Sequence, residues 1–95
     1  MSANQGIIIY CVLRNIVWID GTNMKPTTSW TTVLNTNVIP REYYPSHSIR
    51  IKGCFGNYGV NHMTVHMDTS AIIQISAAQA ATSADGSFTM IYPIL

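Results

Sequence analysis

A length of 95 residues and a net charge of +1 exclude a multidomain protein and a nucleic-acid binder with a basic stripe. Hydrophobic residues make up 47% of the chain and charged residues only 9%, against roughly 25% charged residues in an ordinary soluble domain. So few charges cannot coat a monomer of this size. We therefore expect part of the surface to be buried against further copies of the chain.

Short β-strands separated by turns are predicted along the whole chain. The runs 7–13 and 16–20 flank a two-residue turn, which indicates a β-hairpin. Residues 20–23, Asp-Gly-Thr-Asn, have strong turn chemistry and are expected to close the second strand. The run at 7–13 is far shorter than the ~20 apolar residues of a spanning helix, so we expect no insertion into a membrane.

Five further strands follow this hairpin. They are expected at 30–35, 48–55, 62–68, 71–76 and 87–94. Two prolines bracket residues 38–45, and this rigid connection favours Greek-key or jelly-roll wiring over a meander. The spacing of seven to eight short antiparallel strands predicts an all-β fold, a small jelly-roll or Greek-key barrel or sandwich. We expect a single domain, residues 1–95, with residues 1–5 as a flexible or vector-derived N-terminus.

Alternation is clearest in residues 62–68, His-Met-Thr-Val-His-Met-Asp. Successive side chains of a strand point to opposite faces, so Met63, Val65 and Met67 are predicted to enter the core. The opposite face then carries a polar ladder made of His62, Thr64, His66 and Asp68. Such a ladder can bind a metal ion or a ligand with many hydroxyl groups, and it can equally be the solvated face of a half-buried strand.

A metal ion would find three ligands on this ladder, in His62, His66 and Asp68. A jelly-roll metal site also needs ligands from a second strand, and the next strand offers only Gln74 and Ser76 on one face. We therefore expect no required metal and no cofactor.

Nucleophilic catalysis has no support in the sequence. There is no Gly-x-Ser-x-Gly motif, and neither Cys11 nor Cys54 has an evident base partner. Each cysteine lies in an apolar run, where a free thiol packs as a small hydrophobe, although a disulfide between the two is geometrically possible. Most of the acidic residues lie in or beside predicted turns, which argues against a catalytic carboxylate pair. We expect that the protein is not an enzyme.

Binding a saccharide requires fewer precisely placed side chains on the ladder than binding a metal ion or catalysing a reaction does. Its hydroxyls can bridge the carboxylate of Asp68 and a ring nitrogen of His66, while its apolar face stacks on an aromatic ring. The candidate rings are Trp18, Trp30, Tyr43, Tyr44, Tyr58 and Tyr92. The sequence leaves open which of these rings faces the ladder.

Four landmarks occur in a characteristic order along the chain. They are Gly6-Ile7-Ile8-Ile9, Ile39-Pro40-x-x-x-Tyr44-Pro45, His66-Met67-Asp68 and Tyr92-Pro93-Ile94. Together they resemble the C-terminal head domains of receptor-binding proteins from lactococcal tailed phages, over about residues 4–94. The resemblance implies a small β-barrel or jelly-roll head that forms a homotrimer and binds host cell-wall saccharide near the subunit interfaces. It assigns the sugar contact to His66 and Asp68, and the family's downstream tryptophan is absent, since Gln74 and Ile75 occupy that stretch.

The resulting expectation is a phage receptor-binding head in the distal tail or baseplate of the virion, which mediates adsorption without chemistry. Its expected saccharide-binding residues are His66, Asp68, His62 and Thr64. Its expected partners are two identical subunits, host cell-wall saccharide, and the rest of the baseplate through an N-terminal stem outside this chain. We expect assembly in the host cytoplasm and release by lysis. The alternatives are a small jelly-roll metalloprotein using His62, His66 and Asp68, and a purely structural virion subunit.

Overall fold

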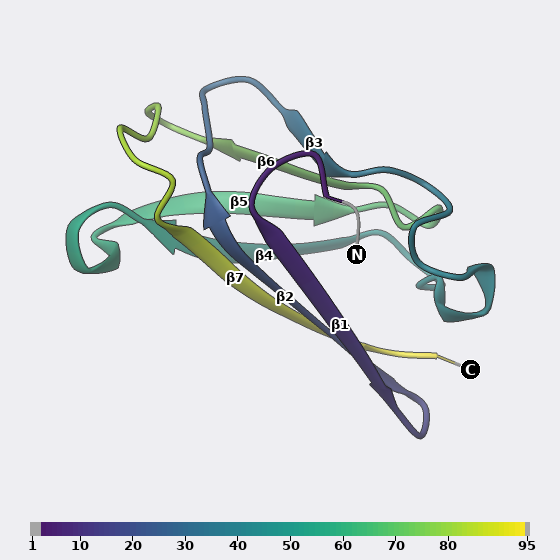
Figure 1. Ribbon diagram of the computed structural model, residues 1–95. Coiled ribbons are helices and arrows are strands. Elements are labelled where there is room, and N and C mark those ends of the chain that lie inside the picture. Colours follow the sequence, from purple (N-terminus) through teal and green to yellow (C-terminus); the bar gives the residue numbers. More distant parts are fainter. Residues whose placement is uncertain (1–2, 95) are drawn as a thin grey trace.

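Buried and exposed side chains alternate along most of the strands of the computed structural model, which describes residues 3–94. Its seven strands are β1 (Ile7–Leu13), β2 (Ile16–Met24), β3 (Thr31–Leu34), β4 (Ile49–Phe55), β5 (Asn61–Met67), β6 (Ile73–Ala77) and β7 (Gly86–Pro93) (Figure 1). Two short 3-10 helices, η1 (Arg41–Tyr43) and η2 (Asn57–Gly59), lie in the connections. Every strand pairing is antiparallel, which confirms the predicted all-β class for the described part of the chain.

The strands form one curled sheet in the order β1-β2-β7-β4-β5-β6-β3. At its middle, β4 and β7 are joined by a single residue pair, Cys54 with Ser87. A Cβ atom on Gly53 would lie 2.6 Å from the carbonyl oxygen of Ser87, so only glycine allows this close approach. The sheet therefore has a three-stranded part (β1, β2, β7) and a four-stranded part (β4, β5, β6, β3), and the two cross one another in Figure 1.

The four-stranded part has the wiring of a Greek key. Successive hairpins join β4, β5 and β6, while β3 lies beside β6 and reaches β4 through a long connection, residues 35–48. This connection contains the stretch at 38–45 that was predicted to be rigid. The hydroxyl of Tyr92 donates to the carbonyl oxygen of Tyr43 at 2.7 Å and fixes it to β7. Burial raises the pKa of Tyr92 to about 12, so the hydroxyl stays a protonated donor at neutral pH.

The core fills the inner side of the curled sheet, between its two parts. Met63, Val65 and Met67 are fully buried there, which confirms the core face predicted for residues 62–68. In the same cluster, β2 contributes Val17 and Ile19. Full burial of a side chain of this size stabilises a fold by about 1.5–3 kcal/mol, so the shared core holds the two parts together.

The turn predicted at residues 20–23 is wrong, because β2 continues to Met24. Gly21 is buried under the ring of Phe88, and a Cβ atom there would overlap with Cε2 of that ring. The register shifts between Gly21 and Met24, and Asn23 has a φ of 57°. The turn-forming residues are therefore accommodated as an irregularity inside the strand, and packing against β7 outweighs the local turn preference.

The segment before β1 links the two end strands of the sheet. The backbone N–H of Asn4 donates to the carbonyl of Val33 in β3 at 2.8 Å, and β1 begins three residues later, at Ile7. The side-chain oxygen of Gln5 accepts the backbone N–H of Lys25 at 2.6 Å. Of the N-terminus predicted to be flexible, residues 1–2 lie outside the described residues.

The packing of Phe88 on Gly21 can be tested by adding one methyl group. We expect Gly21→Ala to destabilise the protein by about 1–3 kcal/mol, because neither the ring nor the strand can move without opening the core. Urea unfolding followed by tryptophan fluorescence measures the effect. Thr22→Ala, on the exposed neighbour, should change the free energy of unfolding by less than about 0.5 kcal/mol. Equal unfolding midpoints for the two variants would show that Phe88 does not press on the backbone of β2.

Candidate functional site

The outer face of the four-stranded part carries polar side chains in rows that cross the strands. Pairing in register places Arg50, His66, Gln74 and Thr32 in one row, and Lys52, Thr64 and Ser76 in the next. The row after that holds Cys54 and His62. The structure therefore brings three of the four predicted ladder residues, His62, Thr64 and His66, onto one face of β5. We call these rows the polar face.

An aromatic ring lies against this polar face. Trp30, the residue before β3, meets His66 edge-on, with 6.2 Å between ring centroids and 64° between ring planes. The guanidinium carbon of Arg50 lies 5.9 Å from the centroid of the Trp30 ring. A cation at this distance from an indole contributes about 0.5–1 kcal/mol at an exposed site, so Arg50 helps to hold the ring in place. Trp30 remains 47% exposed, which leaves part of its surface open to a ligand.

Of the six aromatic candidates, Trp30 is the one that contacts the predicted ladder. Tyr92 is buried, and Trp18 lies on the outer side of the three-stranded part. Tyr58 stands at the tip of the β4–β5 loop and is 96% exposed. The sequence identifies Trp30 only as one of six candidates. What brings Trp30 to the ladder is the pairing of β3 with β6, which lies far away in the chain.

Asp68 has a structural task that the sequence pattern did not reveal. Strand β5 ends at Met67, and Asp68 opens the turn to β6. Its Oδ1 accepts the backbone N–H groups of Ser70 at 2.9 Å and Ile72 at 3.0 Å. Ala71 lies in the left-handed region with a φ of 60°, and its N–H donates to the backbone carbonyl of Asp68 at 3.0 Å. The carboxylate therefore holds a tight turn whose backbone is strained at Ala71.

Hydrogen-bond donors dominate the polar face. The amine of Lys52 donates to Thr64 Oγ1 at 3.2 Å, and Nε2 of Gln74 donates to Thr32 Oγ1 at 3.3 Å. Arg50 and Lys52 are two of the five Lys and Arg residues in the chain, and no Asp or Glu belongs to the rows. Sequence reasoning had not assigned either side chain to a site, although the same alternation along 48–55 places both on this face. The face can bind a ligand that offers acceptors or negative charge.

Two other features bear on the alternatives. Among residues 3–94, no three His, Cys, Asp or Glu side chains come together in a group that could hold a metal ion. His66 instead faces Trp30 and the row of Arg50 and Gln74. In the same part of the chain, no helix is long and apolar enough to cross a membrane.

Comparison with known proteins finds no matching protein family and no matching curated protein.

The turn held by Asp68 gives a prediction about stability. Asp68→Ala removes the acceptor of two backbone N–H groups and should destabilise the protein by about 1–3 kcal/mol in urea unfolding. Asp68→Asn keeps an oxygen in the same place, so we expect a clearly smaller loss. Parent-like stability of Asp68→Ala would mean that the turn forms without the carboxylate.

Proposed function

We propose that the chain is a phage receptor-binding head that recognises host cell-wall saccharide through the polar face and carries out no chemistry. One observation carries the proposal: the half-exposed ring of Trp30 is held by His66 and Arg50 beside a row of hydrogen-bonding side chains. An aromatic ring with polar groups at its edge is the arrangement that binds the apolar face and the hydroxyls of a sugar together.

Trp30 supplies the stacking ring in this proposal. The resemblance to lactococcal phage heads calls for a tryptophan downstream of His66, where this chain has Gln74 and Ile75. Trp30 comes from the opposite direction in the chain, yet its ring lies against the histidine that the resemblance assigns to the sugar. A different segment of the chain therefore provides the same kind of contact.

The other predicted ladder residues, Asp68, Thr64 and His62, lie on or next to the same strand, β5. Both hydrogen bonds to the turn use Oδ1 of Asp68, which leaves Oδ2 for a sugar hydroxyl. Thr64 lies two residues from His66 on the same face and accepts from Lys52. His62 is exposed at the far end of β5 and would contact a longer saccharide chain rather than the sugar that stacks on Trp30.

The charge on the polar face indicates the kind of saccharide. Arg50 and Lys52 present five and three N–H donors respectively in their charged forms, and a guanidinium matches planar acidic groups in a two-bond geometry. A saccharide that carries phosphate or carboxylate groups satisfies these donors better than a neutral one does. We therefore propose an acidic cell-wall saccharide as the ligand.

Assembly and location complete the proposal. The scarcity of charged residues and the resemblance support a homotrimer, placed at the distal tail or baseplate of the virion and joined to the baseplate through an N-terminal stem.

The stacking role of Trp30 can be tested with saccharide fragments released from lactococcal cell walls. We expect Trp30→Ala to weaken binding by roughly tenfold in isothermal titration calorimetry, equivalent to ~1.4 kcal/mol, and His66→Ala to act in the same direction. Trp30→Phe keeps a flat ring and should recover part of the affinity.

Tyr58→Ala is the matched control, because it removes an exposed ring from the loop after β4, outside the polar face. The proposal is wrong if Trp30→Ala and His66→Ala, both folded, bind like the parent. Failure of every variant and the parent to bind any fragment would favour a purely structural virion subunit.

The acidic nature of the ligand predicts a salt dependence. Charges at an exposed face are screened over about 10 Å at 0.1 M salt, so binding should weaken as NaCl is raised. Arg50→Gln and Lys52→Gln should each lower the affinity and flatten this dependence. Arg41→Gln, an exposed residue of η1 outside the rows, should do neither. Affinity that is independent of salt would point to a neutral saccharide.

A further inference from the structure

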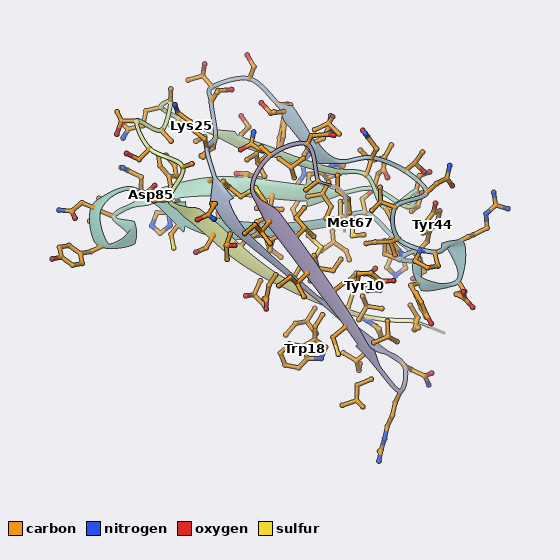
Figure 2. The ribbon with its side chains drawn as sticks, in the orientation of Figure 1. Tyr10, Trp18, Lys25, Tyr44, Met67 and Asp85 are labelled. Carbon is orange, nitrogen blue, oxygen red and sulfur yellow. The ribbon has the colours of Figure 1, made fainter. Side chains whose placement is uncertain are left out.

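The outer face of the three-stranded part is largely apolar, in contrast to the polar face, and its polar residues Asp20, Thr22 and Thr89 lie beside Ile7 and Ile9. Six of the nine large hydrophobic side chains that are exposed in the described residues lie on it: Ile7, Ile9, Leu13, Ile16, Trp18 and Ile91. Figure 2 shows Trp18 projecting away from the body of the protein, on the side of the sheet opposite to Tyr10. We call these six side chains, together with Cys11, the apolar face.

Pairing in register joins most of the apolar face into two neighbouring rows, while Ile7 and Ile9 extend it along β1 beside the polar side chains of Thr22, Asp20 and Thr89. Cys11, Trp18 and Ile91 form one row across β1, β2 and β7, and Leu13, Ile16 and Pro93 form the next. An antiparallel sheet with a core on one side normally carries polar residues on the other. Strand β1 is apolar on both sides, since Ile8, Tyr10 and Val12 face the core, and this pattern is typical of a strand that is covered twice.

The size of the apolar face fits an interface between proteins. Its six large side chains are between 37% and 66% exposed, and together they present on the order of 600 Å² of surface. That is at the upper end of the largest apolar patch on a typical monomer, roughly 300–600 Å². With a polar rim it approaches the roughly 800 Å² that each partner buries in a stable complex.

A pocket of about 290 Å³ opens at the β7 border of the apolar face. Its walls are Pro45, Ser46, His47, Ile49, Ile91, Tyr92 and Pro93. Ile91 belongs to both the pocket and the apolar face, and Pro93 ends the row that begins with Leu13 at the β1 border. The exposed side chain of Leu13 and this pocket therefore lie at opposite borders of one surface. A contact that joins the β1 border of one copy to the β7 border of the next is heterologous, or head-to-tail. Repetition of such a contact closes into a ring when the rotation between successive copies is suitable.

We propose that the apolar face is covered by another copy of this chain, with the β1 border of one copy packed at the β7 border and pocket of the next. The number of copies in the ring rests on the homotrimer of the proposed function, whereas the identity of the surface does not. The polar face belongs to the other part of the sheet, so saccharide binding by one chain does not require the contact.

Cys11 provides a built-in reporter of this contact, because it is exposed in the single chain and lies in the same row as Trp18 and Ile91. In a Cys54→Ser background, Cys11 is the sole thiol. We expect the parent to be an assembly in analytical ultracentrifugation and its Cys11 to react with Ellman's reagent at least tenfold more slowly than in a monomer. Trp18→Lys and Ile91→Lys each place a charge in the contact, and both should give a monomer with fast-reacting Cys11.

Ser83→Lys adds the same charge in the exposed loop before β7 and should leave both the assembly and the slow reaction unchanged. A parent that is monomeric at about 100 μM, with fast-reacting Cys11, overturns the proposal, because a stable complex assembles well below that concentration. Protection of Cys11 that appears only on adding phosphatidylcholine vesicles assigns the face to lipid and overturns it as well.

The same variants separate this proposal from the proposed function. A protected Cys11 in a two-fold dimer would keep the apolar face as the contact surface but would overturn the head-to-tail arrangement, because a two-fold contact uses the same patch on both copies. Retained saccharide binding by monomeric Trp18→Lys shows that the polar face works without the contact. If Trp30→Ala loses saccharide binding while its Cys11 stays protected, both proposals are supported. If the parent assembles but binds no saccharide, the proposal for the apolar face holds and the proposed ligand is wrong.

Discussion

The close approach of β4 and β7 at Gly53 and Ser87 sets the geometry on which the rest of the structure depends. Any side chain at position 53 would meet the carbonyl of Ser87, so the backbone itself forms the junction. From the single pair of Cys54 with Ser87 next to it, the two parts of the sheet diverge, curl around one shared core, and turn their outer faces in different directions (Figure 1). Separate outer faces allow one small chain to be polar and cationic on one part and apolar on the other.

Alternation with a period of two was sufficient to predict β4 and β5, because each pairs with a neighbour in the chain and one face of each meets the core. The burial of Met63, Val65 and Met67 follows from that pattern alone. The same kind of local reasoning failed at residues 20–23, where the ring of Phe88 covers Gly21 and keeps β2 extended. Turn preference is a property of neighbouring residues, whereas the packing that overrode it comes from the last strand.

In the candidate site too, some residues are placed by their neighbours in the chain and others by pairing with distant strands. His62, Thr64 and His66 share a face because they share a strand, and the sequence pattern predicts this directly. Trp30 joins them through the pairing of β3 with β6, in which Thr32 and Gln74 meet across 42 residues of chain. The turn that Asp68 holds depends on where β5 ends, and an alternating pattern does not mark that residue.

The segment around Asn4 has a mechanical consequence. The chain enters against β3 and then continues directly into β1, so the first residues tie together the two edges of an open, curled sheet. A pull along the chain from the N-terminal side would load the Asn4–Val33 hydrogen bond before it could peel β1 from β2. The edge strand is thus shielded by a link to the opposite edge, and tension is shared by both ends of the sheet. Under such a load, that arrangement delays unzipping of the outermost strand.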